Sequence, residues 1–398
     1  AASAQMAKLA YATGYFHFGS APAAQLAEKL VSIAPRSLQH VYFSLGGSDA
    51  VDAALRFITH YCNVTGRPQK KHFISLERGY HGSSSIGAGL TAIASFHRGF
   101  DVPLPTQHYL PSPYAYRDPL GRDGQALIAA SVAALEAKVA ELGGSDHVAA
   151  FFCEPIQGSG GVIVPPVGWL KAMRDACRRL DILFVADEVI TGFGRTGPMF
   201  ACEAENVEPD MMTIAKGLTA GYAPMGAVLM SDAIYQAIAD GEQGQVVGHG
   251  QTYSAHPVSA AVALEVIRLY EDGLIANGQA VAHAFGAGLD SLLDHPLVGD
   301  SRHRGLLGAL ELVADKTSKA RFDPSLRLAD KISAAAYRNG VIFRAFADNI
   351  LGFAPALCFT EHDVALMVER VRATLDEVLA DDAVSAARRA ASGARKAA

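Results

Sequence analysis

Two stretches of the sequence place charged side chains directly after short apolar runs. Residues 182–186 form a continuous apolar run, typical of a strand buried on both faces of a parallel sheet, and Asp187 and Glu188 follow it at once. Residues 211–215 form a similar run, and Lys216 follows it, ahead of a glycine-rich turn. Open α/β sheets bind ligands beyond the carboxyl ends of their strands. The sequence therefore predicts that a carboxylate and a lysine amine meet at one sheet edge.

The separation of these groups fits two neighbouring strand ends. Asp187 and Lys216 are 216 − 187 = 29 residues apart, about the length of one strand-to-strand crossover. We expect Lys216 to be enclosed, because burial disfavours the ammonium form and frees the amine to act as a nucleophile. A lysine and a carboxylate in one pocket suit pyridoxal phosphate, which needs a lysine for its Schiff base and an acid beside its ring nitrogen. From these two residues alone, a buried ion pair that only ties two loops together is an equal alternative.

A glycine-rich helix start is a candidate phosphate site. A short strand over residues 41–43 is followed by Gly46, Gly47 and Ser48, and a helical pattern opens on them. Backbone N–H groups at the start of a helix are unshielded and suit a phosphate. Taken in isolation, such a segment is more often an ordinary capped helix start.

Two more predicted strands end in side chains with possible roles at the same edge. Residues 72–76 are followed by Tyr80 and His81, and residues 148–153 are followed by Glu154. An aromatic side chain at a sheet edge can stack on a cofactor ring. Taken alone, Tyr80 is more often a half-buried core aromatic, and Glu154 is equally well a capping or loop carboxylate.

The motifs together resemble those of a known family. ADEVITGFGRTG at residues 186–197 and AKGLTAGYAPMGAV at residues 215–228 resemble the signature of the class III pyridoxal-phosphate aminotransferases of fold type I. The resemblance is closest to the amine:pyruvate, or omega-, transaminases, and it covers the chain from about Tyr15 to about Leu379. It implies an α/β fold with a mainly parallel central sheet, helices on both faces, and a smaller α+β carboxy-terminal domain.

The resemblance also implies the domain organisation. We expect a large cofactor-binding domain over residues 1–271 and a small carboxy-terminal domain over residues 272–398. The resembling family has further residues upstream that hold part of the small domain and one wall of the substrate pocket. We therefore expect the sequence to begin inside such a protein.

The resemblance assigns roles to individual positions. It makes Lys216 the catalytic, cofactor-linked lysine, Asp187 the acid at the ring nitrogen and Tyr80 the residue that stacks on the ring. Val189, two residues beyond Asp187, can press on the opposite ring face. Thr252, in HGQTYSAHP, matches a threonine that reaches the phosphate of the neighbouring subunit's cofactor, which implies a homodimer with shared sites and leaves a tetramer open. The implied cofactor-binding positions are Gly47, Ser48, Tyr80, His81, Glu154, Asp187, Val189, Lys216 and Thr252.

A separate position is implied for the substrate. Arg344 follows a strand-like run at residues 340–343 and matches the arginine that grips a substrate carboxylate, although without the resemblance a surface arginine is favoured. Ser159 stands where family members acting on ornithine- or GABA-like amines often have a glutamate that pairs with this arginine. A serine cannot neutralise Arg344, so we expect a donor without an α-carboxylate.

These expectations define a reaction and its alternatives. The reaction is a ping-pong transfer of an amino group from an amine or omega-amino acid to pyruvate or a similar keto acid. A decarboxylase or aminomutase on the same site remains an alternative, as does a binding protein without turnover. A nicotinamide dehydrogenase is poorly supported, because no GxGxxG segment follows an early strand.

Composition limits the other classes of function. The 398 residues are 50% hydrophobic and 19% charged, with a net charge of −6, which gives ample core and no basic footprint for nucleic acid. No apolar run approaches the roughly 20 residues that span a bilayer. Five cysteines without a CxxC pair indicate buried thiols and a reducing, cytoplasmic setting, and no histidine pair favours a metal site. We expect the alanine-rich basic tail to be frayed.

Overall fold

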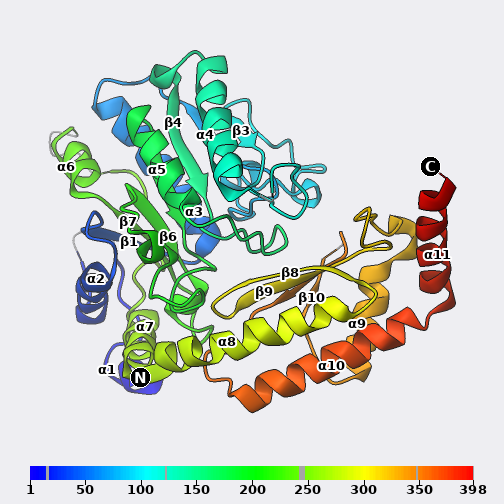
Figure 1. The fold of residues 1–398 in the computed structure, drawn as a ribbon. Coiled ribbons are helices and arrows are strands. Elements are labelled where there is room, and N and C mark those ends of the chain that lie inside the picture. The colour runs from blue at the N-terminus through cyan, green and yellow to red at the C-terminus, as the bar shows by residue number, and fades with distance from the viewer. Residues whose placement is uncertain (15–17, 122, 242–246, 347, 398) are drawn as a thin grey trace. The chain divides into compact units, whose positions relative to one another are not determined.

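The computed structural model describes residues 1–14, 18–121, 123–241, 247–346 and 348–397, with side chains up to residue 393 (Figure 1). Tyr15, where the resemblance begins, lies outside the described residues. By its internal contacts the chain divides into two compact units. The first comprises Ala1–Phe193 and Pro198–Asp272, and the second comprises Gly194–Gly197 and Gly273–Ala398. That residues 1–271 are a cofactor-binding domain and residues 272–398 a separate small domain stays a prediction.

The first unit is built on a seven-stranded sheet in the order β1-β7-β6-β5-β4-β2-β3. Strands β3, β2, β4, β5 and β6 pair in parallel, whereas β7 runs antiparallel to both of its neighbours, β6 and β1. The bounds are β1 His40–Ser44, β2 His72–Leu76, β3 Gln107–Leu110, β4 Val148–Cys153, β5 Leu183–Asp187, β6 Met211–Ile214 and β7 Gly226–Met230. This arrangement confirms the mainly parallel sheet that the sequence predicts.

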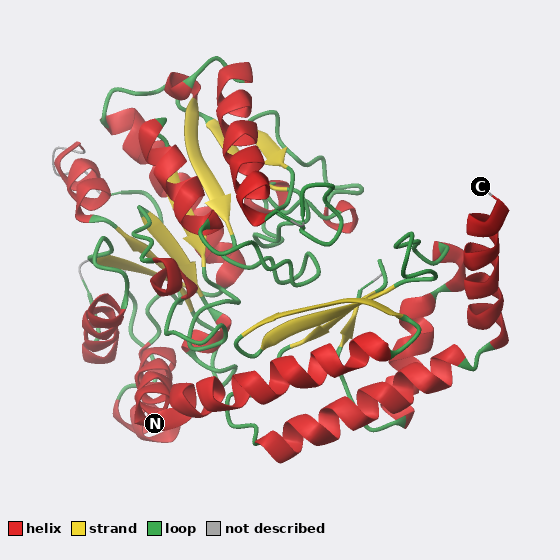
Figure 2. Cartoon of the chain, viewed as in Figure 1, coloured by secondary structure: helices red, strands yellow, loops and turns green. Residues whose placement is uncertain are grey.

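Helices cover both faces of this sheet (Figure 2). Apolar residues of α3 pack on one face against Phe152 of β4, Val185 of β5 and Val228 of β7. Figures 1 and 2 show α4 and α5 on the opposite side of the sheet. The helices of this unit are α1 Ala2–Lys8, α2 Ala21–Ile33, α3 Gly47–Val64, α4 Gly124–Glu141, α5 Trp169–Arg179, α6 Asp232–Gly241 and α7 Pro257–Leu269.

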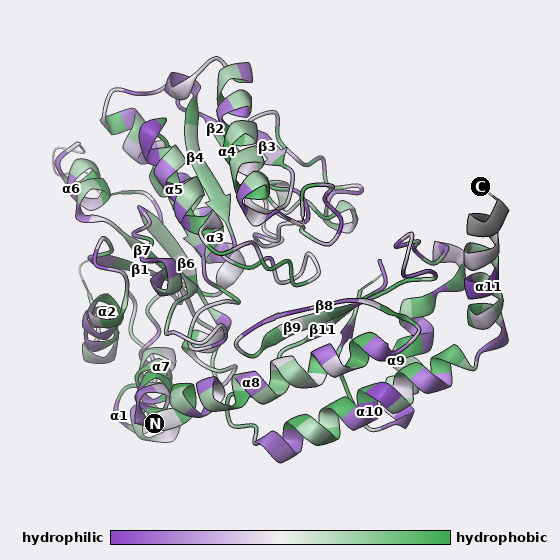
Figure 3. Ribbon diagram, viewed as in Figure 1, coloured by the Kyte–Doolittle hydropathy of each residue, from purple (hydrophilic) through white to green (hydrophobic). Residues whose placement is uncertain are grey.

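Burial on both faces explains the composition of the central strands. All six residues of β4 are buried, and Figure 3 shows this strand in the hydrophobic colour along its length. Helix α5 differs, because its apolar residues such as Trp169 and Met173 form a stripe along one face and its charged residues occupy the opposite face. None of the helices in the described part of the chain combines the length and the hydropathy that crossing a bilayer requires.

The second unit contains an antiparallel sheet in the order β10-β11-β9-β8. Helix α10 packs against both α8 and α9. The strands are β8 Val298–Arg304, β9 Leu307–Leu312, β10 Arg344–Ala345 and β11 Ile350–Phe353, and the helices are α8 Ile275–Ser291, α9 Leu328–Arg338, α10 Glu361–Leu379 and α11 Asp382–Ala397. The alanine-rich segment forms α11, since alanine and arginine are both strong helix formers. Fraying of this tail stays a prediction.

Candidate active site

A cavity of about 440 Å³ lies at the carboxyl edge of the central sheet, within the size range of small-molecule sites. The segments that follow β1, β2, β4, β5 and β6 all contribute to its wall, as does the first turn of α3. The structure thus brings together eight residues that the sequence analysis assigned to one site. They are Gly47, Ser48, Tyr80, His81, Glu154, Asp187, Val189 and Lys216.

Asp187 and His81 form a buried polar pair in this cavity. Both side chains are buried, and His81 Nδ1 lies 2.8 Å from Asp187 Oδ2. Asp187 Oδ1 also accepts a hydrogen bond from the Val189 backbone N–H at 3.2 Å. Burial lowers the pKa of His81, but its hydrogen bond to Asp187 and the charges of Asp187 and Glu154 outweigh that effect, so the pKa of His81 is raised. His81 therefore favours a proton on Nδ1 that is donated to the Asp187 carboxylate.

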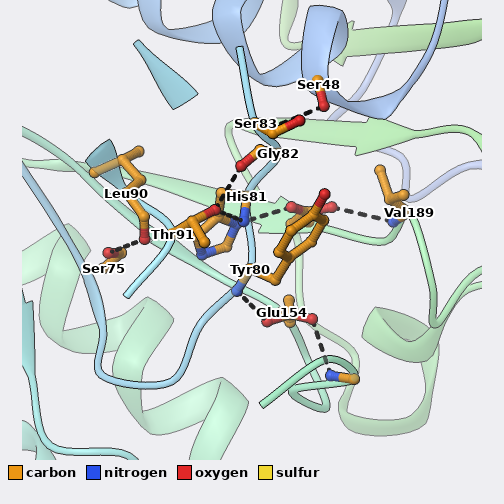
Figure 4. A network of polar contacts seen from close by, with 12 residues as sticks. Ser48, Ser75, Tyr80, His81, Gly82, Ser83, Leu90, Thr91, Glu154 and Val189 are labelled. Atoms are coloured by element: carbon orange, nitrogen blue, oxygen red, sulfur yellow. Dashed lines mark hydrogen bonds and ion pairs between the residues drawn. The ribbon is translucent and has the colours of Figure 1, made fainter. Parts of the chain in front are cut away.

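Glu154 is a second buried carboxylate at this edge, and it binds backbone groups. Glu154 Oε2 accepts from the Tyr80 N–H at 3.0 Å, and Oε1 accepts from the Gly158 N–H at 2.9 Å. Burial raises the pKa of Glu154 to about 7, with a further upward contribution from Asp187, while His81 and the two N–H donors act downward. Figure 4 shows Tyr80, His81 and Glu154 gathered in one network beside Val189.

Strand alternation separates the two adjacent acids of the opening motif. Val185 and Asp187 are two residues apart on β5, so their side chains point to the same sheet face, the one that α3 covers. Glu188 points the other way and does not line the cavity; its carboxylate accepts hydrogen bonds from Thr191 and from the Cys202 N–H. Of the one or two carboxylates that the sequence placed here, Asp187 is the one in the cavity, and Glu188 supports the loop after β5.

Lys216 lines the cavity but is not enclosed in the chain as described. Lys216 is exposed, so the prediction that it is enclosed, and that burial therefore disfavours its ammonium form, was wrong. Strand β6 ends at Ile214, and a short 3₁₀ turn over Lys216–Leu218 carries the lysine at the open rim. Its backbone has a φ of 37°, in the left-handed region, where a residue with a Cβ costs about 1–2 kcal/mol. That conformation interrupts the strand alternation, which lets both Ala215 and Lys216 line the cavity.

The start of α3 has the features of a phosphate site. This 18-residue helix has no side-chain cap at its N-cap residue Gly46, and its first turn opens on the cavity. The Ser48 Oγ accepts from the Ser83 N–H at 3.2 Å, which leaves the hydroxyl hydrogen available to a ligand. Gly82, with a φ of 98°, brings its loop so close that a Cβ there would lie 2.8 Å from Ser48. These residues fit the phosphate of the predicted cofactor.

Several residues of the cavity wall were missed by the sequence analysis. The loop after Lys216 contributes Thr219 and Met225, and the segment after β5 contributes Ile190. Thr219 closes the loop on itself, because its hydroxyl donates to the Ala223 carbonyl oxygen at 2.5 Å. The glycine-rich sequence after the lysine was the available signal, since a tight turn at a strand end keeps its residues near that edge.

Two predicted site residues do not line this cavity. The Thr252 residue is exposed in the first unit, and its carbonyl oxygen accepts from the Tyr11 hydroxyl at 3.0 Å. Arg344 belongs to the second unit, where it is exposed on β10 with its guanidinium 4.6 Å from the centre of the Phe346 ring. Their roles in cofactor and substrate binding stay predictions. Within the described residues, no cluster of three histidine, cysteine or acidic side chains has a geometry that would hold a metal.

Comparisons with known proteins agree with this geometry. The family profile described as Aminotransferase class-III matches residues 1–375. The putrescine–pyruvate aminotransferase of Pseudomonas aeruginosa is 39% identical over 383 residues, covering 96% of this chain and 82% of its own length. The diaminobutyrate–2-oxoglutarate transaminase of Halomonas elongata is 37% identical, covering 94% and 81%. The crystal structure of the omega transaminase from Pseudomonas jessenii, in complex with PMP, superimposes with a TM-score of 0.92 at 37% identity, covering 95% and 84%.

Proposed function

Because the chain belongs to the class III aminotransferases, which use pyridoxal phosphate, we propose that it transfers an amino group from an amine or omega-amino acid to pyruvate or a similar keto acid. The observation that carries this proposal is the meeting of Lys216 with the Asp187–His81 pair in one cavity at the sheet edge. The transfer is ping-pong: the donor's keto product leaves before the acceptor enters.

The cavity offers a partner for each part of the cofactor. The first turn of α3, with Gly47 and Ser48, would hold the phosphate, and Lys216 Nζ would link to the cofactor. Asp187, held in place by His81, would accept a hydrogen bond from the protonated ring nitrogen. Tyr80 and Val189 would lie on the two faces of the ring. When bound, pyridoxal phosphate supplies an electron-accepting ring that makes amino-group transfer possible.

Lys216 also handles the proton that moves during the transfer. When the donor takes the place of Lys216, the freed Nζ amine can take a proton from the substrate carbon and return it, as a general base and acid. The Asp187 carboxylate contributes a negative charge that favours a protonated partner at the ring position. Because His81 donates from Nδ1 to Asp187, it fixes the orientation of this carboxylate.

The donor class follows from residues outside the cofactor cavity. Ser159 carries no charge that could pair with Arg344, which leaves the Arg344 guanidinium available for the carboxylate of the keto acid. A donor with no carboxylate next to its amine fits this arrangement.

We place the enzyme in the cytoplasm and infer that it is a homodimer. Four of the five cysteines are buried free thiols, which suits a reducing compartment. Thr252 would complete the phosphate site of the neighbouring subunit. Light scattering coupled to gel filtration measures the mass in solution, and a monomer that retains full activity would contradict the shared site.

The proposal is tested by absorption spectroscopy of the protein with pyridoxal phosphate. An amine panel of putrescine, β-alanine, taurine and 1-phenylethylamine is added first, and pyruvate second. We expect the band of the lysine-bound cofactor to fall with the amine and to return with pyruvate as alanine forms. A wild-type protein whose band no amine changes, or an Lys216→Ala variant that retains the lysine-bound band, would contradict the assignment.

A further inference from the structure

A small hairpin follows β4 behind the cavity wall. Gln157 and Ile163 pair as an isolated antiparallel bridge, with N–H···O distances of 3.2 and 2.9 Å. Between residues 151 and 163, Ser159 is the residue that is not buried, and it stands at the turn of this hairpin. We call residues 157–163 the β4 hairpin.

The β4 hairpin is fastened to the loop that carries Tyr80. The Gln157 side-chain amide donates to the Glu77 carbonyl oxygen at 2.9 Å, and Arg78 Nε donates to the Gly160 carbonyl oxygen at 2.9 Å. The two backbones are in close contact, since a Cβ at Gly160 would lie 2.3 Å from the Arg78 carbonyl oxygen. The hairpin and the Tyr80 loop are therefore held in a fixed register.

The same hairpin supports the cavity wall from behind. Glu154 joins the Gly158 N–H to the Tyr80 N–H through its two carboxylate oxygens. A Cβ at Gly158 would lie 2.6 Å from Ile190 Cδ1, so the hairpin backbone presses on Ile190. Tyr80, Glu154 and Ile190 all line the cavity. A shift of the hairpin would change the spacing of these three side chains.

Arg78 itself does not line the cavity, and its conformation is constrained. Its backbone has a φ of 61°, in the left-handed region, and its guanidinium lies 5.3 Å from the centre of the Tyr114 ring. A side chain that is held on two sides and bonded to a turn carbonyl can fix that turn.

We propose that Arg78 is a positioning residue that fastens the β4 hairpin and thereby sets which amine donors fit the cavity. This inference rests on the proposed function for its second half, because donor selection requires transamination. Its first half, the fastening, concerns the folded chain alone. Arg78 acts through the Gly160 carbonyl and through the hairpin, without contact to the reacting atoms.

The test compares Arg78→Ala with a matched variant, Arg174→Ala. Arg174 is also half-buried and also donates from Nε to a backbone carbonyl, that of Glu208 at 3.0 Å, but it lies far from this cavity wall at the opposite edge of the sheet. Both proteins are prepared with pyridoxal phosphate. Amide hydrogen exchange of residues 157–163 is measured, together with kcat/KM for putrescine and for 1-phenylethylamine at saturating pyruvate.

We expect exchange in the β4 hairpin to rise by about tenfold or more in Arg78→Ala and to stay unchanged in Arg174→Ala, because a hydrogen bond from a charged donor is lost. The ratio of the two kcat/KM values should shift by about threefold or more in Arg78→Ala only. Arg78→Lys, which keeps the charge and a donor, should lie between wild type and Arg78→Ala and is the variant to use if Arg78→Ala folds poorly.

Two results would overturn the inference. Unchanged exchange in the hairpin would show that Arg78 does not fasten it. Faster exchange with an unchanged donor ratio would show that the hairpin does not shape the donor site. The exchange readout needs no turnover, so a failure of the proposed function, seen as a wild type that forms no alanine from any amine, is distinct from either result.

Discussion

The central sheet has a charged cavity at each edge, and only the one at the carboxyl edge has the features of an active site. The amino-edge cavity has a volume of about 370 Å³, against about 440 Å³ at the carboxyl edge. Its wall contains Arg67, Lys70, Arg174, Asp181 and Asp210. Neither size nor the presence of charge distinguishes the two.

The difference lies in where the polar groups are directed. At the amino edge, Lys70 donates to the Asp181 carbonyl, Arg174 to the Glu208 carbonyl, and Asp210 accepts from the Phe184 N–H. Helices α3 and α5 also end there, and the dipole at a helix C-terminus favours cations. At the carboxyl edge, the first turn of α3 has no side-chain cap, and Lys216 lines the cavity rim. The uncapped first turn of α3 and the lysine at the rim therefore distinguish the carboxyl-edge cavity, whereas these three amino-edge side chains bond backbone groups.

The largest expected difference between the two edges is in the effect of losing a lysine. Lys216→Ala should lower kcat by about four orders of magnitude or more, because the base and the cofactor link are lost together. Lys70→Ala should leave kcat within about twofold and lower the free energy of unfolding by about 1–3 kcal/mol, because a part-buried carbonyl loses its donor. Alanine formation and urea unfolding measure the two effects. Equal losses of kcat in both variants would remove the distinction between the edges.

A second pair of variants compares the buried acids. Asp187→Asn should lower kcat by about 100- to 1000-fold, because the amide cannot supply the charge beside the ring nitrogen. Asp210→Asn keeps an oxygen for the Phe184 N–H and should leave kcat nearly unchanged. Steady-state rates at saturating cofactor decide this; a fully active Asp187→Asn protein would mean that another group fills the role.

The third prediction concerns the pH dependence of stability. Burial raises the pKa of Glu154 from 4.5 to about 7, so the folded state holds this proton more tightly than the unfolded state does. The contribution of Glu154 to the free energy of unfolding therefore decreases as pH rises through this window. Glu154→Gln removes this titration. The difference in unfolding free energy, variant minus wild type, should therefore increase by about 3 kcal/mol between pH 4.5 and a pH of about 7.

Urea unfolding of the cofactor-free proteins at pH steps from about 4 to about 8, a range that spans the ordinary and the raised pKa of Glu154, measures this change. Burial also raises the pKa of Asp210, so Asp210→Asn is the amino-edge control and should shift in the same direction. Parallel pH curves for Glu154→Gln and wild type would contradict the raised pKa.

The smallest predicted effect depends on backbone conformation. Lys216 has a φ of 37°, whereas Lys70 is not among the described residues with a positive φ. The free energy of unfolding of Lys216→Gly should therefore exceed that of Lys216→Ala by about 1 kcal/mol, because alanine at this position retains the strain of the left-handed backbone. At position 70 the order should be the opposite: Lys70→Ala should be more stable than Lys70→Gly by about 0.5–1 kcal/mol, because glycine there only adds conformational freedom to the unfolded chain. Urea unfolding of the four variants tests the reversal.

Much of the fold was predictable because apolar runs mark buried parallel strands. Strands β2 and β4 have the predicted bounds, whereas β5 is shifted by one residue, from the predicted 182–186 to Leu183–Asp187. Strand β3 was not predicted, because its four residues QHYL carry no apolar run and lie in a proline-rich segment. The apolar strand β7 was also not identified, although its residues GAVLM form an apolar run of the kind that marks the other buried strands.

The site was predictable as a set of residues but not as a set of contacts. Strand ends identified Asp187, Lys216 and Glu154 as candidates, and a glycine-rich helix start identified Ser48. The resemblance then gave these residues their roles. The pairing of His81 with Asp187 joins residues 106 positions apart, so no local spacing predicts it. The opposite directions of Asp187 and Glu188 depend on where β5 ends, and the exposure of Lys216 depends on the turn that follows β6.

The second unit is discontinuous in the sequence, which limits how it can be exchanged by recombination or removed by truncation. The second unit includes Gly194–Gly197, which the gene encodes before the last part of the first unit. Arg195 in this segment bonds the carbonyl oxygens of Leu306 and Pro355, and the Gly197 carbonyl accepts from Gln279. Recombination or truncation at a single point near residue 273 would separate the second unit from these four residues. A transplantable version of that unit would need three crossover points, one before residue 194, one after residue 197 and one near residue 273.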